Sequence, residues 1–123
     1  MTKEKKIFIA DDDPDILEIL SLMLRTNKYN VQASTNANDI FKYQEDLPDL
    51  ILLDIWMSGL DGREICKRLK ENKLTKKIPV IFVSANSNIE EITHQYKAQG
   101  YIAKPFEMKK LLKEIDVVLY KDN

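Results

Sequence analysis

The chain has 123 residues, the length of one compact domain, and we expect residues 1–123 to form a single domain. Its 19 Lys and Arg residues nearly balance 20 Asp and Glu residues, so the formal net charge of -1 offers no positive field for a nucleic-acid backbone. Cys66 is the only cysteine, which excludes an internal disulfide, and the N-terminal apolar run is too short for a signal peptide or a membrane span. We therefore expect a cytoplasmic protein that contacts neither nucleic acid nor membrane directly.

The predicted secondary structure alternates between strands and helices. Four short apolar runs predict strands that are covered on both faces, and a fifth run with alternating polarity predicts an edge strand. Segments with apolar residues at helical spacing lie between these runs. In chain order we predict a strand at 7–10, a helix that begins at Pro14, the edge strand at 31–34, a helix at 37–45, a strand at 50–53, a helix at 61–72, a strand at 80–83, a helix at 89–99, a strand at 101–103 and a helix at 108–119. This order predicts an α/β doubly wound sandwich with a parallel sheet.

Polar residues follow four of the predicted strands directly. The carboxyl ends of parallel strands meet at one edge of a sheet, where ligands bind at the topological switch point. Each residue alone has a simpler explanation, such as helix capping for the aspartates before Pro14, a loop hydroxyl, or a solvated lysine. Their joint position favours a functional site, for which the candidates are Asp11, Asp12, Asp54, Ser84 and Lys104.

Several segments resemble the signature segments of response-regulator receiver domains, the CheY-like domains of two-component signal transduction. They are residues 7–16, 52–57, 59–62, 83–85 and 101–106, and the resemblance covers essentially the whole chain. It implies a flavodoxin-like (βα)5 fold whose five parallel strands have the order 2-1-3-4-5. This strand order follows from the resemblance alone.

The resemblance also implies that Asp54 accepts a phosphoryl group from a phosphohistidine of a sensor histidine kinase or a histidine phosphotransfer protein. An anion then attacks an anion, so the reaction needs a hard divalent cation with oxygen ligands, and Mg²⁺ is the implied cofactor. By similarity its ligands are Asp12, Asp54 and the backbone carbonyl of Trp56, while Asp11 acts through bound water. Such a chain assists its own phosphorylation and dephosphorylation but is not a turnover enzyme.

Three further residues receive roles from the same resemblance. Lys104 contacts a phosphoryl oxygen, and Ser84 donates its hydroxyl to another only after phosphorylation, which distinguishes two states of the protein. Tyr101 then moves with Ser84 and changes the surface of the fourth helix, fifth strand and fifth helix, where a downstream protein binds. The sequence stops a few residues after the last helix, and if it is a complete protein we expect the signal to leave through protein contacts.

The chain departs from the family pattern at a few positions. Ser58 stands where proline is common, Lys97 stands where glycine is common, and the stretch from Ser84 to Tyr101 is short. The bulky side chain of Trp56 is expected to restrict hydrolytic water and to give a long-lived aspartyl phosphate.

Other functions are disfavoured by particular residues. A haloacid-dehalogenase phosphatase needs a second acid at the position of Trp56, the acidic loop after the first strand does not suit flavin phosphate, and no glycine-rich nucleotide loop is present. The remaining alternative is a receiver-like docking module that acts without phosphorylation. We expect His94 to lie on the surface, and Cys66 to fill space in the third helix.

Overall fold

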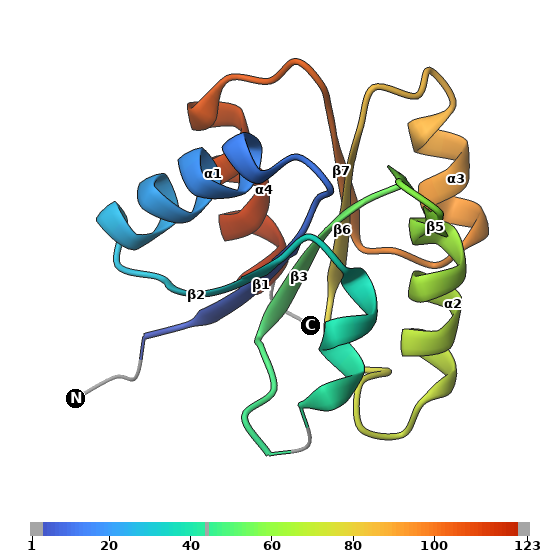
Figure 1. Ribbon diagram of the computed structural model, residues 1–123. Coiled ribbons are helices and arrows are strands. Elements are labelled where there is room, and N and C mark those ends of the chain that lie inside the picture. Colours follow the sequence, from blue (N-terminus) through green and yellow to red (C-terminus); the bar gives the residue numbers. More distant parts are fainter. Residues whose placement is uncertain (1–3, 44, 121–123) are drawn as a thin grey trace.

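The core of the molecule is a five-stranded parallel sheet between two layers of helices (Figure 1). The computed structural model describes residues 4–43 and 45–120. The sheet contains β1 (Lys6–Ala10), β2 (Asn30–Ser34), β3 (Leu50–Asp54), β6 (Val80–Ser84) and β7 (Gly100–Ala103). Their order is β2-β1-β3-β6-β7, which confirms the predicted order 2-1-3-4-5.

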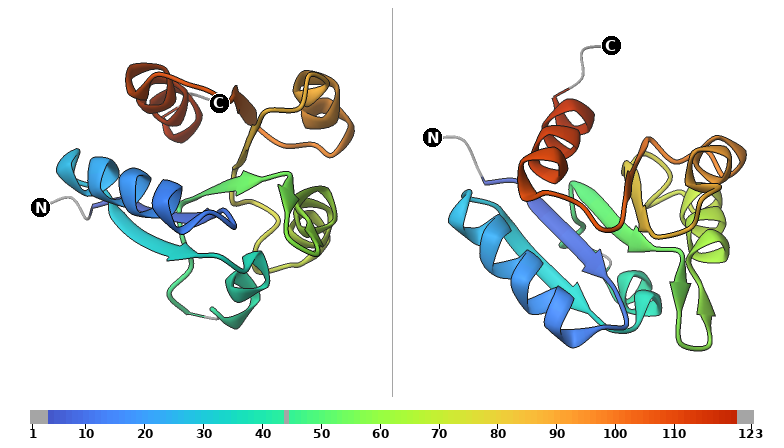
Figure 2. Two further views of the ribbon diagram at one scale, coloured as in Figure 1. Left: turned by 45° about the horizontal axis from the view of Figure 1, so that its top comes forward. Right: turned by 90° about the horizontal axis from the view of Figure 1, so that it is seen from above.

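Helices cover both faces of this sheet, as the two views in Figure 2 show. One face carries α1 (Pro14–Thr26) and α4 (Met108–Leu119), and the other carries the 3₁₀ helix η1 (Ala37–Lys42), α2 (Gly62–Glu71) and α3 (Ile89–Gln95). An apolar cluster fills the space under each helical layer. The predicted doubly wound sandwich is therefore confirmed.

Strand burial follows the apolar pattern of the sequence. Every residue of β3 and β6 is buried, whereas β2 is only partly covered, as expected for an edge strand. Parallel pairing aligns Ala10 with Leu53 and Asp54 with Val83. The polar residues that follow these strands consequently lie at the same edge of the sheet.

Two predicted helices were too long. The segment predicted as a helix at 37–45 forms only the 3₁₀ helix η1, whose first turn is capped by the Asn36 side chain. The helix predicted at 89–99 ends at Gln95, because Lys97 adopts a left-handed conformation with a φ of 61°, which an α-helix does not accommodate.

A small antiparallel hairpin was not predicted. It consists of β4 (Trp56–Met57) and β5 (Leu60–Asp61), and it lies between β3 and α2. Gly59 supplies the left-handed residue of its turn, with a φ of 67°. The hairpin fixes the chain that leaves the carboxyl end of β3.

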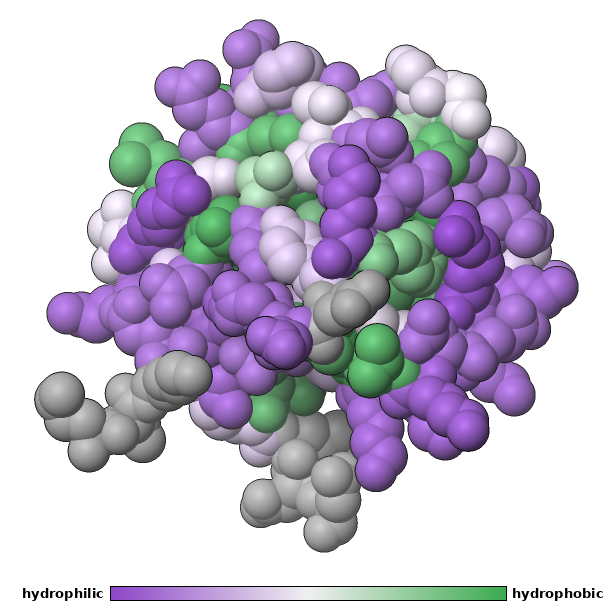
Figure 3. Space-filling model, turned by 60° about the horizontal axis from the view of Figure 1, so that its bottom comes forward, coloured by the Kyte–Doolittle hydropathy of each residue, from purple (hydrophilic) through white to green (hydrophobic). Residues whose placement is uncertain are grey.

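The outside of the molecule is mainly polar. The face in Figure 3 is mostly hydrophilic, and its apolar residues lie in small separate areas. Within the described residues, no helix combines the length and the apolar character that crossing a bilayer requires.

Candidate functional site

The three consecutive aspartates after β1 have different roles. The side chain of Asp13 caps α1 by accepting a hydrogen bond from the backbone N–H of Asp15 at 3.0 Å. The N–H of Asp13 itself donates to Oδ1 of Asp11 at 3.0 Å. Helix capping therefore accounts for Asp13, and it leaves Asp11 and Asp12 free to form a site.

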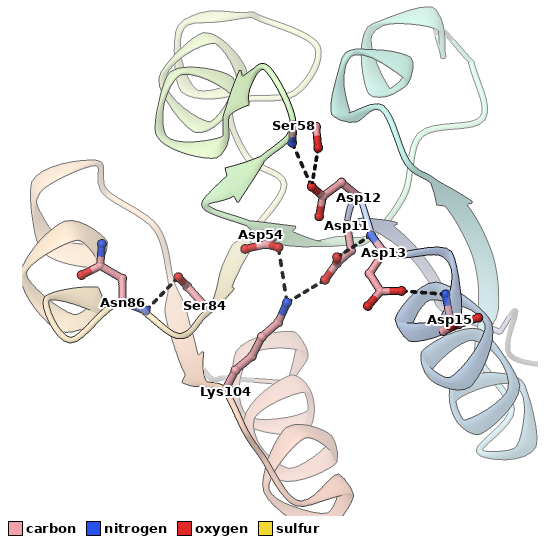
Figure 4. A network of polar contacts seen from close by, with 9 residues as sticks. All are labelled: Asp11, Asp12, Asp13, Asp15, Asp54, Ser58, Ser84, Asn86 and Lys104. Atoms are coloured by element: carbon pink, nitrogen blue, oxygen red, sulfur yellow. Dashed lines mark hydrogen bonds and ion pairs between the residues drawn. The ribbon is translucent and has the colours of Figure 1, made fainter.

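Lys104 joins the ends of three strands. Its Nζ donates to Oδ2 of Asp11 at 2.9 Å and to Oδ2 of Asp54 at 3.3 Å (Figure 4). Asp11 is 3% exposed and Asp54 is 7% exposed, so both carboxylates have lost most of their hydration. Buried carboxylates are tolerated when a counter-charge lies this close.

Asp12 points toward the hairpin and is held there by Ser58 (Figure 4). Both the backbone N–H and the hydroxyl of Ser58 donate to Oδ2 of Asp12, each at 2.9 Å. These hydrogen bonds, the side-chain one first, lower the pKa of Asp12 below its ordinary value. Ser58 was noted in the sequence only as a departure from proline, and no sequence signal indicated this contact.

The carboxylates of Asp11, Asp12 and Asp54 converge. One carboxylate oxygen from each lies within 4.8 Å of the other two. Three negative groups at this separation repel one another, and Lys104 contributes only one positive charge. Hard oxygen donors in this number suit a small divalent cation such as Mg²⁺, which usually keeps several waters.

Opposing effects act on the ionisation of Asp54. Burial raises the pKa of its carboxyl above the ordinary value, while the charge of Lys104 acts to lower it. Burial acts to lower the pKa of Lys104, but the hydrogen bond to Asp11 and the charge of Asp54 raise it above the ordinary value. Lys104 therefore stays charged beside Asp54, whose ionised form is disfavoured by burial and favoured by the ammonium.

Ser84, at the end of β6, lies near Asp54 and Lys104 and lines one cavity with them. Its side chain is buried, and its Oγ accepts a hydrogen bond from the backbone N–H of Asn86 at 3.1 Å. The hydroxyl proton of Ser84 is therefore available to another acceptor. A cavity of about 380 Å³ adjoins these groups and is lined by Asp54, Trp56, Ser84, Ala85, Asn86 and Lys104.

Two aromatic residues border this region. Trp56 lines the cavity and is 53% exposed. Tyr101 packs in part against the apolar cluster, and its hydroxyl donates to Oε1 of Glu90 on α3 at 2.7 Å. The Tyr101 hydroxyl thus links β7 to α3.

Gly62 is a structural requirement of the site that the sequence alone did not identify. Its N–H donates to the carbonyl of Ile55 at 2.6 Å. A Cβ at this position would lie 2.1 Å from the backbone oxygen of Asp54. Only glycine permits α2 to begin so close to the end of β3.

The two residues predicted to lie outside the site do so. His94 is exposed on α3, and Cys66 is fully buried in α2. Burial raises the pKa of the Cys66 thiol to about 11, so this cysteine is an unreactive core residue.

Comparison with protein families identifies one that covers most of the chain. The model of the response regulator receiver domain matches residues 7–116. The nisin biosynthesis regulatory protein NisR of Lactococcus lactis subsp. lactis is 40% identical over 116 residues, which are 90% of this chain and 48% of that protein. The DNA-binding dual master transcriptional regulator RpaA of Synechocystis is 32% identical over 93% of this chain and 48% of its own length. The chain thus spans about half the length of these curated relatives.

Solved structures have the same fold. Chemotaxis response regulator CheY4 of Vibrio cholerae superposes with a TM-score of 0.86 at 25% identity, over 95% of this chain and all of that one. The receiver domain of sensor histidine kinase PA1611 from Pseudomonas aeruginosa PAO1 has a TM-score of 0.83 at 23% identity, over 95% of this chain and 98% of that one. That structure contains a magnesium ion coordinated in its active site cleft.

Proposed function

Because this chain belongs to the response regulator receiver domains of two-component systems, whose general function is phosphorylation-based switching, we propose that Asp54 is its phosphoacceptor. The observation that carries this proposal is the position of Asp54, which lies at the end of β3 beside Lys104 and within a cluster of carboxylates. A cavity adjoins it on the side of Ser84. The remaining roles follow from this arrangement.

In the proposed reaction an oxygen of the Asp54 carboxylate attacks the phosphorus of a phosphohistidine on a partner protein. The new P–O bond forms as the P–N bond breaks, and the imidazole nitrogen of the partner keeps the electron pair. Lys104 stabilises the negative charge of the phosphoryl oxygens through its ammonium. Since Lys104 already contacts Asp54 before the reaction, little rearrangement of its side chain is needed.

We propose that Asp12, Asp54 and the backbone carbonyl of Trp56 hold Mg²⁺, and that Asp11 assists through water. When bound, this ion offsets the repulsion between the carboxylates and the incoming phosphoryl group. The two hydrogen bonds from Ser58 orient the Asp12 carboxylate, as the outer contacts of metal ligands commonly do.

Ser84 and Tyr101 are the proposed switch residues. A phosphoryl group on Asp54 offers the Ser84 hydroxyl a new acceptor, so the phosphorylated state gains a contact that the unmodified state lacks. Movement of Ser84 frees Tyr101 to leave Glu90, which alters the surface formed by α3, β7 and α4. This surface is the proposed binding site for a downstream protein.

The proposed partners are a histidine kinase or a histidine phosphotransfer protein and that downstream target. The expectation that the chain makes no direct contact with nucleic acid stays a prediction, because RpaA is a DNA-binding regulator of which this chain spans about half. A cytoplasmic location and a single domain over residues 1–123 also belong to the proposal.

Intact-mass analysis with acetyl phosphate and Mg²⁺ tests the acceptor. We expect one phosphoryl group to add to the wild-type protein, and none to add to Asp54→Asn or after chelation of the metal with EDTA. Asp13→Asn is the matched control, since Asp13 caps α1 and should leave the mass gain intact. A wild-type chain that gains no mass while binding a partner would favour the phosphorylation-independent docking module.

A further inference from the structure

The β4–β5 hairpin, which follows β3, and the start of α2 bring the side chains of Trp56, Asp61 and Arg63 together. Trp56 in β4 pairs with Asp61 in β5 across the antiparallel ladder. The guanidinium carbon of Arg63, in the first turn of α2, lies 4.5 Å from the centre of the Trp56 ring. This distance is within the range in which an arginine cation attracts the face of an indole.

Asp61 holds Arg63 in this position. Its Oδ2 accepts from Nη2 of Arg63 at 2.8 Å, and its Oδ1 accepts from Nε at 3.0 Å. Oδ1 also accepts from the backbone N–H of Arg63 at 2.9 Å, which caps α2. A guanidinium bound by two parallel hydrogen bonds has a defined plane, so it can fix the aromatic ring on which it stacks.

The indole fixed in this way borders the cavity beside Asp54, the proposed phosphoacceptor. Trp56 lines this cavity together with Asp54 and Lys104, although its side chain is more than half exposed. A tryptophan with this much exposure is free to change rotamer unless a neighbour restrains it. Among the described residues, Arg63 is the cation that stacks on it.

We propose that Arg63, anchored by Asp61, is a positioning residue that holds the Trp56 indole in the lining of the cavity beside Asp54 and so prolongs the life of the aspartyl phosphate. This inference rests on the proposed function, because it concerns hydrolysis of the phosphoryl group on Asp54. Hydrolysis requires a water molecule to attack phosphorus from the side opposite the Asp54 oxygen. A new P–O bond then forms from the water, the bond between phosphorus and the Asp54 oxygen breaks, Asp54 keeps the electron pair as a carboxylate, and inorganic phosphate leaves. An indole held in the lining of the cavity restricts that approach, and a mobile one restricts it less.

The test combines the lifetime of the phosphate with the fluorescence of Trp56, the single tryptophan of the chain. Wild-type and Arg63→Ala proteins are loaded with acetyl phosphate and Mg²⁺, freed of donor, and followed by intact mass. Loss of phosphate should be about two- to fivefold faster in Arg63→Ala, the factor that a cation–π contact at a partly exposed site is worth. Acrylamide quenching of Trp56 should increase in the unphosphorylated variant, because the ring becomes more accessible.

Arg68→Ala is the matched control. Arg68 also belongs to α2 and stacks on an aromatic ring, with its guanidinium carbon 4.1 Å from the centre of Phe41. Removing it should change neither the quenching nor the phosphate lifetime. An Arg68→Ala variant that matched Arg63→Ala in both measurements would overturn the proposal, since the effect would then belong to α2 in general.

A double variant separates positioning from general destabilisation. If Arg63 acts through the indole, Arg63→Ala should not shorten the phosphate lifetime further in a Trp56→Ala background. An equal acceleration in both backgrounds would overturn the proposal, and so would unchanged quenching in Arg63→Ala. A wild-type protein that gains no Asp54-dependent mass would instead overturn the proposed function. The quenching experiment uses unphosphorylated protein, so it still tests whether Arg63 restrains Trp56 in that case.

Discussion

The pocket beside Asp54 has a proposed acceptor side and a proposed switch side, which are built differently. The acceptor side comprises Asp11, Asp12, Asp54 and Lys104, which are joined by direct ion pairs or by hydrogen bonds from the hairpin. The switch side comprises Ser84 and Tyr101, together with α3. Here the Ser84 hydroxyl proton has no fixed acceptor among the described residues, and Tyr101 is tied to α3 by one exposed hydrogen bond.

Under the proposed function, this difference separates the residues of the phosphoryl-transfer chemistry from those of signalling. Groups that must stabilise charge in a transition state are most effective when they are already in position, as they are on the acceptor side. A switch needs contacts that can be exchanged for others of similar free energy. The exposed hydrogen bond between Tyr101 and Glu90 is a contact of this kind. Substitutions on the two sides should therefore differ in size and in kind.

The largest effect is expected next to the acceptor side, at Gly62, which packs against the backbone of Asp54. Gly62→Ala would place a methyl group against the backbone oxygen of Asp54, so either β3 or α2 must shift. We expect a loss of about 3 kcal/mol in the free energy of unfolding, together with slower phosphorylation. Urea denaturation measures the first and intact mass the second.

Gly59→Ala provides the contrast within the same hairpin. No atom lies within 4 Å of the added methyl group, and only the left-handed φ of 67° opposes it. The cost should be about 1 kcal/mol, with phosphorylation nearly unchanged. Equal losses in the two variants would contradict a steric role for Gly62.

The next largest effect is expected at Lys104. Lys104→Ala leaves the carboxylates of Asp11 and Asp54 buried without their counter-charge, which should cost about 2–3 kcal/mol in metal-free buffer. Added Mg²⁺ should recover part of this loss by neutralising the same carboxylates. Lys113→Ala, an exposed lysine on α4, should have almost no effect, and a similar loss there would argue against the ion pairs as the cause.

A smaller effect of opposite sign is expected in the turn between α3 and β7. Lys97 has a φ of 61°, a conformation that glycine adopts without strain. Lys97→Gly should raise the free energy of unfolding by about 0.5–1 kcal/mol, measured by urea denaturation. Lys67→Gly, at an exposed helical position in α2, should instead lower it by about 1 kcal/mol. A loss at both positions would show that the left-handed strain at Lys97 is negligible.

The smallest effect concerns the bond between Tyr101 and Glu90. The hydrogen bond to Glu90, with burial and the carboxylate charge as lesser causes, raises the pKa of the Tyr101 phenol. Since the folded-state pKa lies above the unfolded value, the contribution of this bond is complete below the unfolded pKa and is lost as the pH rises through the folded one.

Glu90→Gln should therefore return the pKa of Tyr101 toward its ordinary value. The difference between ultraviolet titrations of the parent and Tyr101→Phe proteins isolates this phenol, and the same pair in the Glu90→Gln background measures the change. An unchanged pKa would mean that Glu90 does not hold Tyr101 in solution.

The sequence by itself determined the fold class and predicted which polar residues would gather in the candidate site. Continuous apolar runs are required wherever a strand is buried on both faces, so β3 and β6 were recognisable from residue type alone. The carboxyl ends of parallel strands share one edge, and this rule predicted that the residues following β1, β3, β6 and β7 would meet. The strand order and the proposed roles came from resemblance to a family.

Tertiary structure alone decided how each of these residues is held. That Asp13 caps α1 while Asp12 accepts two hydrogen bonds from Ser58 depends on the direction of each side chain, which residue type does not specify. The early end of α3 depends on one backbone angle at Lys97, and the stacking of Arg63 on Trp56 depends on a hairpin of only two residues per strand. Periodic patterns report average burial along an element, whereas contacts of this kind arise from the packing of segments that are irregular or distant in sequence.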